Sequence, residues 1–309
     1  MEEKKPFVGA LRTPEEKTLF FHGAISPDGR RIATSTHKNE LCIWDADTGE
    51  GLYRKRMDMP IMSLEFSPDG KNLMITPSYG VVYFFDMESW EVRDLPIKDC
   101  PISIYSPVYS PNGEYIVTGV RSKEIYIVDA KTGKLYRRPL KGHTDFINSI
   151  AFSPDGTKIV STSEDETIRI WDVTTGRQIG KPLTGYDCSY EHVRFTPDGE
   201  RIIAAGRYKH IAPMWDVRTR ELVGQPLAWH SGDITCIAFS HDGKKIATGA
   251  HDQTIRLWDA DTGRPIGQPM YGHILNIHTV GFSHDDKRVF SVAFERTIRF
   301  WDISNWVLQ

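Results

Sequence analysis

The sequence predicts an all-β fold, a seven-bladed β-propeller in which each blade is a four-stranded antiparallel sheet. Two observations lead to this prediction. Between Gly142 and Leu183, three short segments alternate apolar and polar residues, which is typical of half-buried strands, and a fourth carries Pro182. The pattern then recurs seven times along 309 residues, in steps of 41 to 44 residues. This period, with four strands per unit, indicates a propeller.

The best-formed unit shows why each strand is expected. Its alternating segments are Ile147–Phe152, Lys158–Ser163 and Thr167–Trp171. Turn residues separate them, since Ser153-Pro154-Asp155-Gly156 matches a type I turn and Thr175-Gly176 is a second reversal. The last segment, Arg177–Leu183, is expected at a sheet edge because proline has no N–H to donate. Such a sheet cannot bury both faces alone and needs neighbours of its own kind.

Two sets of marker residues place the seven repeats. The first marker is the residue before each Ser-Pro-Asp-Gly-like turn: Ile25, Phe66, Tyr109, Phe152, Phe195, Phe239 and Phe282. The second precedes an Asp on the third strand: Trp44, Phe85, Val128, Trp171, Trp215, Trp258 and Trp301. The second marker follows the first by 19 residues in six repeats and by 20 in the fifth, whose second hairpin therefore has one extra residue. The repeats span residues 19–53, 60–95, 103–140, 146–183, 189–227, 233–270 and 276–309 of a single domain, 1–309.

The ring must also close, because an unpaired blade edge would stay exposed. Two segments are candidates for the outer strand of the last blade, Pro6–Leu11 and Trp306–Gln309. The second is very short, so we favour the N-terminal segment.

Trp-Asp and Gly-His dipeptides recur at fixed places in the repeats. They are Trp44-Asp45, Trp171-Asp172, Trp215-Asp216, Trp258-Asp259, Trp301-Asp302, Gly142-His143 and Gly272-His273. On these residues the chain resembles the WD-repeat family over nearly its whole length. The resemblance implies the propeller fold but no single function, since this fold hosts many functions.

The resemblance also implies a structural hydrogen-bonded network of His, Ser or Thr, Asp and Trp in each well-formed blade. The matching residues are His143, Ser161, Asp165 and Trp171 in the fourth repeat, His230, Thr248, Asp252 and Trp258 in the sixth, and His273, Ser291 and Trp301 in the seventh. Glu295 replaces the Asp of the seventh repeat, and the other four repeats lack the His. We expect these residues to be structural rather than a catalytic triad, because the pattern recurs and includes the Trp.

In the family, each repeat offers three positions to the narrower, top mouth of the ring. Carried onto this sequence, they predict a partner-binding set: Phe21, His37, Met62, Tyr105, Arg121, Phe146, Glu164, Glu191, Tyr208, Asp233, His251, His278 and Phe294. Position Tyr208 depends on where the extra residue of the fifth repeat lies. Aromatic groups dominate the set, and exposed aromatics and Arg mark interaction surfaces. Arg121 is its lone cation, whereas Glu164, Glu191 and Asp233 predict a mouth that suits a peptide with an apolar anchor and a Lys or Arg.

The leading functional prediction is a non-catalytic scaffold that binds a protein or peptide on its top face, without cofactor or metal. The alternative is a small-molecule-binding or enzymatic propeller that uses the same mouth, where His37, His251 and His278 would be the candidate metal or acid–base groups. Against this alternative, equivalent positions on neighbouring blades are expected to lie too far apart to share one ion. A further alternative is a sensor fragment of a larger signalling protein; the initiator Met and the closed repeat count favour a complete chain.

Composition narrows the partner classes. A formal net charge of −3 argues against a nucleic-acid or anionic-membrane footprint, and the runs Arg54-Lys55-Arg56 and Arg137-Arg138 are interpreted as solvated edges. Cys42, Cys100, Cys188 and Cys236 lack zinc-motif spacing and are expected to be buried, reduced thiols. With no apolar leader or spanning stretch, the sequence favours a cytoplasmic protein, with the nucleus as the alternative. We expect a monomer or a subunit of a larger complex.

Overall fold

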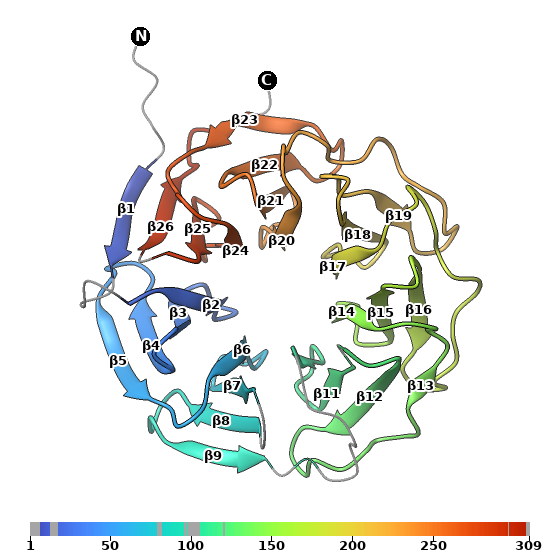
Figure 1. Cartoon of the computed structure of the whole chain (residues 1–309), viewed down its shortest axis with the longest axis horizontal. Helices are drawn as coiled ribbons and strands as arrows, with labels where there is room; N and C mark the ends of the chain where they lie inside the picture. The colour runs from blue at the N-terminus through green and yellow to red at the C-terminus, as the bar shows by residue number, and fades with distance from the viewer. Residues whose placement is uncertain are drawn as a thin grey trace.

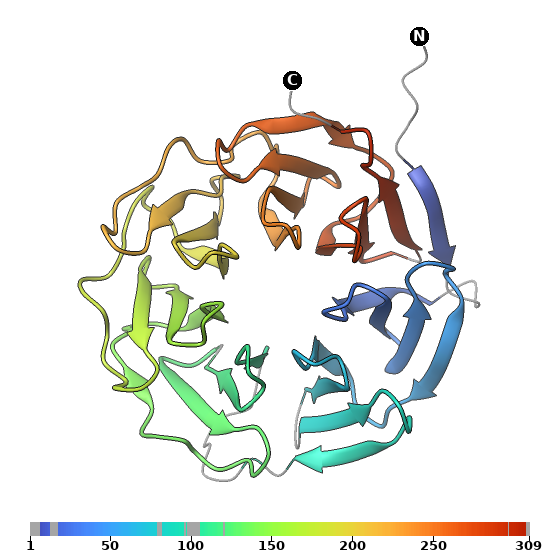
Figure 2. The same ribbon diagram turned by 180° about the vertical axis from the view of Figure 1, so that it is seen from behind.

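The structure, a computed structural model, describes residues 7–12, 18–78, 82–95, 97, 106–119, 121–295 and 297–306. Seven antiparallel sheets radiate from a common centre and close into a ring, seen from its two faces in Figures 1 and 2. Among these residues every regular element is a strand, and none is a helix long and apolar enough to cross a bilayer. The predicted all-β, seven-bladed propeller is confirmed.

The first three blades each contain four strands. Blade one comprises β2 (Phe20–Ile25), β3 (Arg31–Thr36), β4 (Glu40–Asp45) and β5 (Gly51–Arg56). Blade two comprises β6 (Ile61–Phe66), β7 (Asn72–Pro77), β8 (Val82–Asp86) and β9 (Val92–Leu95). Blade three comprises β10 (Val108–Tyr109), β11 (Tyr115–Thr118), β12 (Glu124–Asp129) and β13 (Leu140–Lys141).

The last four blades complete the ring. Blade four comprises β14 (Ile147–Phe152), β15 (Lys158–Ser163) and β16 (Ile168–Asp172), and blade five β17 (Tyr190–Phe195), β18 (Arg201–Gly206) and β19 (Met214–Asp216). Blade six comprises β20 (Ile234–Phe239), β21 (Lys245–Ala250), β22 (Ile255–Asp259) and β23 (Pro265–Met270). Blade seven comprises β24 (Ile277–Phe282), β25 (Arg288–Ala293) and β26 (Thr297–Asp302).

The N-terminal strand closes the ring. β1 (Phe7–Arg12) pairs antiparallel with β26 and becomes the fourth strand of blade seven, and Figure 1 shows blue β1 beside red β26. This strand overlaps the favoured candidate segment, of which Pro6 lies outside the described residues. Residues 307–309 of the other candidate also lie outside them.

The outer edges of blades four and five differ from the others. Their fourth segments pair only through isolated bridges, such as Trp171–Gln178 and Ile168–Leu183 in blade four. Gly180, with φ +68°, and Pro182 lie between these bridges, whereas blade six pairs β23 around its equivalent Gly267 and Pro269 with a register shift. The expected edge strand Arg177–Leu183 is therefore an extended segment that touches the sheet at its two ends.

The core is divided among the blade interfaces. Seven buried apolar clusters each join two neighbouring blades, including the first and the seventh. The largest fully buried side chains are Trp171, Trp215, Trp258 and Trp301, one in each of blades four to seven. Burying an aromatic of this size stabilises the fold by about 4–6 kcal/mol on an area basis. Since each cluster needs two blades, no blade is stable alone.

One basic residue does not behave as the sequence suggested. Arg137, on the outer segment of blade three, donates to the carbonyl oxygens of Val173, Thr174 and Thr175 at 2.5–2.7 Å, in the turn of blade four. The interpretation of Arg137-Arg138 as a solvated edge is therefore wrong for Arg137. A guanidinium has several donors in one plane and can satisfy three carbonyls of one turn.

Candidate functional site

A recurring backbone hydrogen bond defines the top face. In blade four the N–H of Glu164, at the start of the second hairpin, donates to the carbonyl of Phe146, just before the first strand, at 2.9 Å. Five other blades repeat this bond at 2.8–3.1 Å: His37 to Leu19, Ser78 to Pro60, Arg207 to Ser189, His251 to Asp233 and Phe294 to Asn276. The three top-face positions of each repeat are the residue just before the first strand, a residue early in that strand and one at the start of the second hairpin. This bond brings the first and the last of them together at one end of these six blades.

A β-bulge places the remaining position. In blade four the register shifts between Ile147 and Ser149, so Asn148 is the extra residue. The same shift makes bulge residues of Met62, Glu191, Thr235 and His278. In blade one the shift spans Phe21 and His22. Because bulges redirect a side chain out of the pleat, these residues are directed differently from their strand neighbours.

Blade five changes one predicted residue. Its recurring hydrogen bond is made by Arg207, one residue before the predicted Tyr208. The extra residue of this repeat thus lies after position 207, and counting back from Trp215 across it gave the wrong register. Tyr208 remains at the surface, with 73% of its area exposed, and the Arg207 guanidinium lies 5.0 Å from its ring centroid.

In blade three the predicted set is only partly visible. Tyr105 lies outside the described residues, and Arg121 is exposed. The N–H of Arg121 donates to the carbonyl of Ile147 in blade four, so this hairpin is hydrogen-bonded to the next blade.

Four of the predicted residues form one aromatic cluster between blades seven and one. The Phe21 ring lies 5.9 Å from Phe294 in an edge-to-face arrangement and 6.4 Å from His37. The Phe294 ring also lies 4.6 Å from His278. Phe21 and Phe294 remain 37% and 40% exposed, which is unusual for phenylalanine on a soluble domain.

Two aliphatic residues that the sequence did not indicate extend this cluster. Ile274 and Leu275 are 70% and 43% exposed. The Ile274 N–H donates to the Glu295 carboxylate at 2.8 Å, which holds this loop beside Phe294. A signal was present in the repeat alignment, because blade four has Thr144-Asp145 at these positions. We call Phe21, His37, Ile274, Leu275, His278 and Phe294 the seven–one patch.

The histidines of the seven–one patch are held in specific states. Burial and the neighbouring His22, whose ring centroid lies 6.3 Å away, lower the pKa of His278 to about 3. Its imidazole is therefore neutral at pH 7, and its Nε2 has no hydrogen-bond partner among the described residues. His37 Nδ1 accepts the N–H of Leu19 at 3.0 Å. Within the described chain, His37, His251 and His278 belong to no group of side chains that could hold a metal ion.

The predicted acidic residues lie on blades four to six but are already paired. The Arg207 guanidinium donates to Glu164 at 2.8 Å and lies 3.0 Å from Glu191. His210 lies 2.9 Å from Asp233. Burial, partly offset by Arg207, raises the pKa of Glu191. Arg207 and His210 therefore already contact the three acidic groups, and the binding of a basic peptide there stays a prediction.

The remaining predicted residues stand apart from the seven–one patch. Phe146 is 53% exposed on blade four, His251 is exposed on blade six, and Met62 is half-buried on blade two. The structure records no ring contact between Phe146 and the seven–one patch in the part of the chain that it describes. The top face thus has one compact apolar area and scattered aromatic residues elsewhere.

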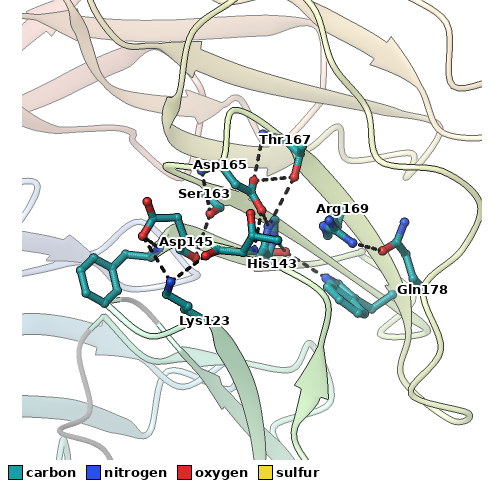
Figure 3. Close-up of polar contacts among 12 residues, drawn as sticks. Lys123, His143, Asp145, Ser163, Asp165, Thr167, Arg169 and Gln178 are labelled. Carbon is teal, nitrogen blue, oxygen red and sulfur yellow. Dashed lines mark hydrogen bonds and ion pairs between the residues drawn. The ribbon is translucent and has the colours of Figure 1, made fainter.

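The structural network of blade four is complete (Figure 3). His143 lies between Asp165, 2.9 Å from Nδ1, and Ser161, 2.7 Å from Nε2, and the Trp171 indole N–H donates to Ser161 at 2.9 Å. Burial lowers the pKa of His143, so the ring is neutral. Each proton then has one acceptor: Trp171 N–H to Ser161, the Ser161 hydroxyl to Nε2, and Nδ1–H to Asp165.

Blades six and seven repeat the arrangement with different atoms. In blade six, His230 contacts Asp252 and Thr248, and Trp258 donates to Thr248 at 2.8 Å. In blade seven, His273 contacts Glu295 at 2.7 Å and Ser291 at 2.6 Å, and Trp301 donates to Ser291 at 2.9 Å. Glu295 therefore occupies the place of the missing Asp. The three hydroxyl residues, Ser161, Thr248 and Ser291, have no exposed area, so none is accessible as a nucleophile.

The three blades with complete networks are also the blades that a comparison with known proteins matches. A family model described as WD domain, G-beta repeat matches residues 133–172, 222–259 and 263–302, which end at the Trp-Asp pairs of the three blades with complete networks. A second family model, described as Outer membrane protein assembly factor BamB, is similar to residues 15–140. No curated protein matches the chain. Three repeats that match the WD-domain family model thus lie inside a closed ring of seven blades.

Proposed function

We propose that this protein is a non-catalytic scaffold that binds a protein or peptide partner on its top face, at the seven–one patch. WD-repeat propellers are commonly protein-interaction scaffolds and generally not enzymes. The observation that carries the finer proposal is the cluster of exposed aromatic rings between blades seven and one, with the exposed Ile274 and Leu275 in the adjacent loop. Such a cluster on a soluble domain marks an interaction site.

The geometry suits an apolar anchor. Phe21 and Phe294 meet edge to face, and half-buried His278 packs against Phe294, so these rings are held before a partner arrives. Aromatic anchors in rigid surroundings lose little conformational freedom on binding, which favours affinity. Ile274 and Leu275 extend the apolar area outward along blade seven.

The charged part of the top face serves a second role in this proposal. Arg121 on blade three and the Arg207 group on blades four and five surround the mouth on the side away from the seven–one patch. Exposed charges of this kind affect orientation and association rate more than affinity. A partner with one apolar anchor and a charged flank fits both regions.

The test combines site-specific cross-linking with direct binding. A photo-cross-linking residue at position 294 is expected to capture a partner from source-cell lysate, and the same residue at Tyr136, which is 44% exposed on blade three, is not. With the purified partner, the double variant Phe21→Ala with Phe294→Ala should bind about 30-fold more weakly, or about 2 kcal/mol. Tyr136→Ala is the matched control and should bind as wild type does. Equal cross-linking from both positions, or unchanged affinity of the double variant, would overturn the site.

We also propose that the protein is cytoplasmic. The described cysteines, Cys42, Cys188 and Cys236, are buried free thiols, and burial raises the pKa of Cys42 and Cys236 to about 12. Such thiols are typical of a reducing compartment. Cys100 lies outside the described residues. Fractionation of source cells with an antibody to the protein tests this, and a secreted protein would contradict it.

A further inference from the structure

The innermost strands surround a cavity at the mouth opposite the top face. Figure 1 shows the first strand of each blade ringing the centre. A cavity of about 440 Å³ is lined by Ala24, Glu65 and Arg194 of these strands and by Pro27, Pro68 and His241 of the first hairpin turns. First hairpin turns and second hairpins lie at opposite ends of each second strand, so this cavity faces away from the seven–one patch.

One position of the repeat contributes Ala24, Glu65, Arg194, Ala238 and Gly281 to this wall. It is the residue before the first marker, and it is small and apolar in five blades: Ala24, Val108, Ala151, Ala238 and Gly281. The two exceptions carry opposite charges, Glu65 on β6 of blade two and Arg194 on β17 of blade five. A channel that needed only to be filled would not place one acid and one base here, three blades apart.

Neither charged group forms an ion pair within 4 Å with a described residue. Glu65 makes no hydrogen bond or ion pair with any described residue, although its charge and that of Arg194 interact. Arg194 donates only to the carbonyl of its own neighbour Val193, at 2.9 Å. Burial raises the pKa of Glu65 to about 7, an effect that Arg194 partly offsets. A partly buried carboxyl and a guanidinium at the rim thus line one cavity without forming an ion pair with each other, and the carboxyl lacks the partner that would compensate for its burial.

We propose that this lower mouth binds a small aliphatic amino acid, with its ammonium on Glu65 and its carboxylate on Arg194. Glu65 is the deeper group and Arg194 is exposed at the rim, so the ammonium and the carboxylate of such a ligand would bind at different depths. Partly exposed Ile25 and Phe239 line the cavity between them and suit an alkyl chain. The site is independent of the partner proposed for the top face.

A series of ω-amino acids of increasing length tests the separation between Glu65 and Arg194. Calorimetric titration from 3-aminopropanoate to 6-aminohexanoate should show one chain length that binds best, with one molecule per chain. Butylamine and butanoate, which carry only one of the two charges, should bind at least about tenfold more weakly than the best zwitterion, a difference of about 1.4 kcal/mol.

Variants of Glu65 and Arg194 test which end of the ligand each residue binds. Glu65→Gln, which keeps the size and removes the charge, should lose about tenfold or more in affinity for the zwitterion, and so should Arg194→Gln. Glu114→Gln, an exposed change on blade three, is the control and should have no effect. Glu65→Asp shortens the acid by one methylene, so the preferred ligand should become one methylene longer.

Thermal unfolding of each variant shows that the fold is intact. The proposal is overturned if no member of the series binds saturably, if the one-charge compounds bind as well as the zwitterions, or if both Gln variants bind like wild type. Loss of partner binding at Phe294 would leave this result unchanged, so the two sites can be judged separately.

Discussion

Blades four and five are neighbours with the same strand order, yet they are stabilised differently. In blade four, Trp171 ends a chain of buried hydrogen bonds through Ser161, His143 and Asp165. In blade five, Ala204 and Tyr186 stand where the hydroxyl and the imidazole would be. Trp215 instead packs edge to face on Tyr190, with ring centroids 5.5 Å apart. The fold therefore requires a large ring at this position, and either a polar network or an aromatic neighbour can hold it.

Removing the shared hydroxyl should produce the largest difference between the two blades. Ser161→Ala leaves the Trp171 N–H and His143 Nε2 without their common partner, which should lower the free energy of unfolding by about 2–4 kcal/mol. Ala204→Ser, the reverse change in blade five, has no imidazole to join and should change it by less than about 1 kcal/mol. Urea unfolding of both variants measures this. Equal losses would show that the network is not what holds blade four.

At the channel wall, a histidine of blade five should make the free energy of unfolding depend on pH, and the equivalent residue of blade four should not. Burial, with Arg194 nearby, lowers the pKa of His192 to about 3, whereas blade four has Ser149 at the same position. As the pH falls, the unfolded chain therefore binds a proton at His192 before the folded chain does. The contribution of His192 to the free energy of unfolding is thus complete above pH 6.5 and decreases as the pH falls toward 3.

Between pH 7 and pH 5 this single group should lower the free energy of unfolding by about 2 kcal/mol. His192→Ser, which gives blade five the residue of blade four, should flatten the decline measured by urea unfolding at a series of pH values. Gln268→Ser, an exposed change on blade six that neither adds nor removes a titratable group, is the control and should leave the slope nearly as it was. A slope unaltered by His192→Ser would contradict the assignment.

A smaller effect is expected where blade three holds blade four. Arg137→Ala removes three charge-assisted hydrogen bonds to the turn Val173–Thr175 of blade four, and the partial exposure of the site limits the loss to about 1–2 kcal/mol. Arg138→Ala is the adjacent control and should lie within about 0.5 kcal/mol of wild type. Thermal unfolding distinguishes them, and equal behaviour would restore the interpretation of both as solvated.

The smallest effect is expected at the ion pair that joins blades four and five on the top face. Glu164 and Arg207 are each about a third exposed, at 33% and 36%. Glu164→Gln should therefore change the free energy of unfolding by less than about 1 kcal/mol and only at low salt. A larger loss that persists at high salt would mean that the pair is a structural link between the blades.

The sequence predicted what repeats and missed what depends on contacts between repeats. The marker residues and their spacing were enough for seven blades. The family resemblance supplied the network residues of blade four, and the shortness of the C-terminal candidate favoured the N-terminal closing strand. The register error at Tyr208 arose because a single extra residue can lie on either side of a hairpin tip. The pairing of Arg207 with Glu164 and the contacts of Arg137 join different blades, and no periodic pattern reports them. Ile274 and Leu275 were visible as departures from the repeat, but only the structure places them beside Phe294.

The pairing of β1 with β26 has a consequence for biosynthesis. The two strands lie about 285 residues apart, from Arg12 to Thr297, and the ring has no other described strand at that edge. At translation rates of about 5–20 residues per second, β1 waits roughly 15–60 s for its partner. During that time its backbone and the open face of blade one are without their final neighbours. The nascent chain is thus expected to need a chaperone most between the emergence of its first blade and the release of its last.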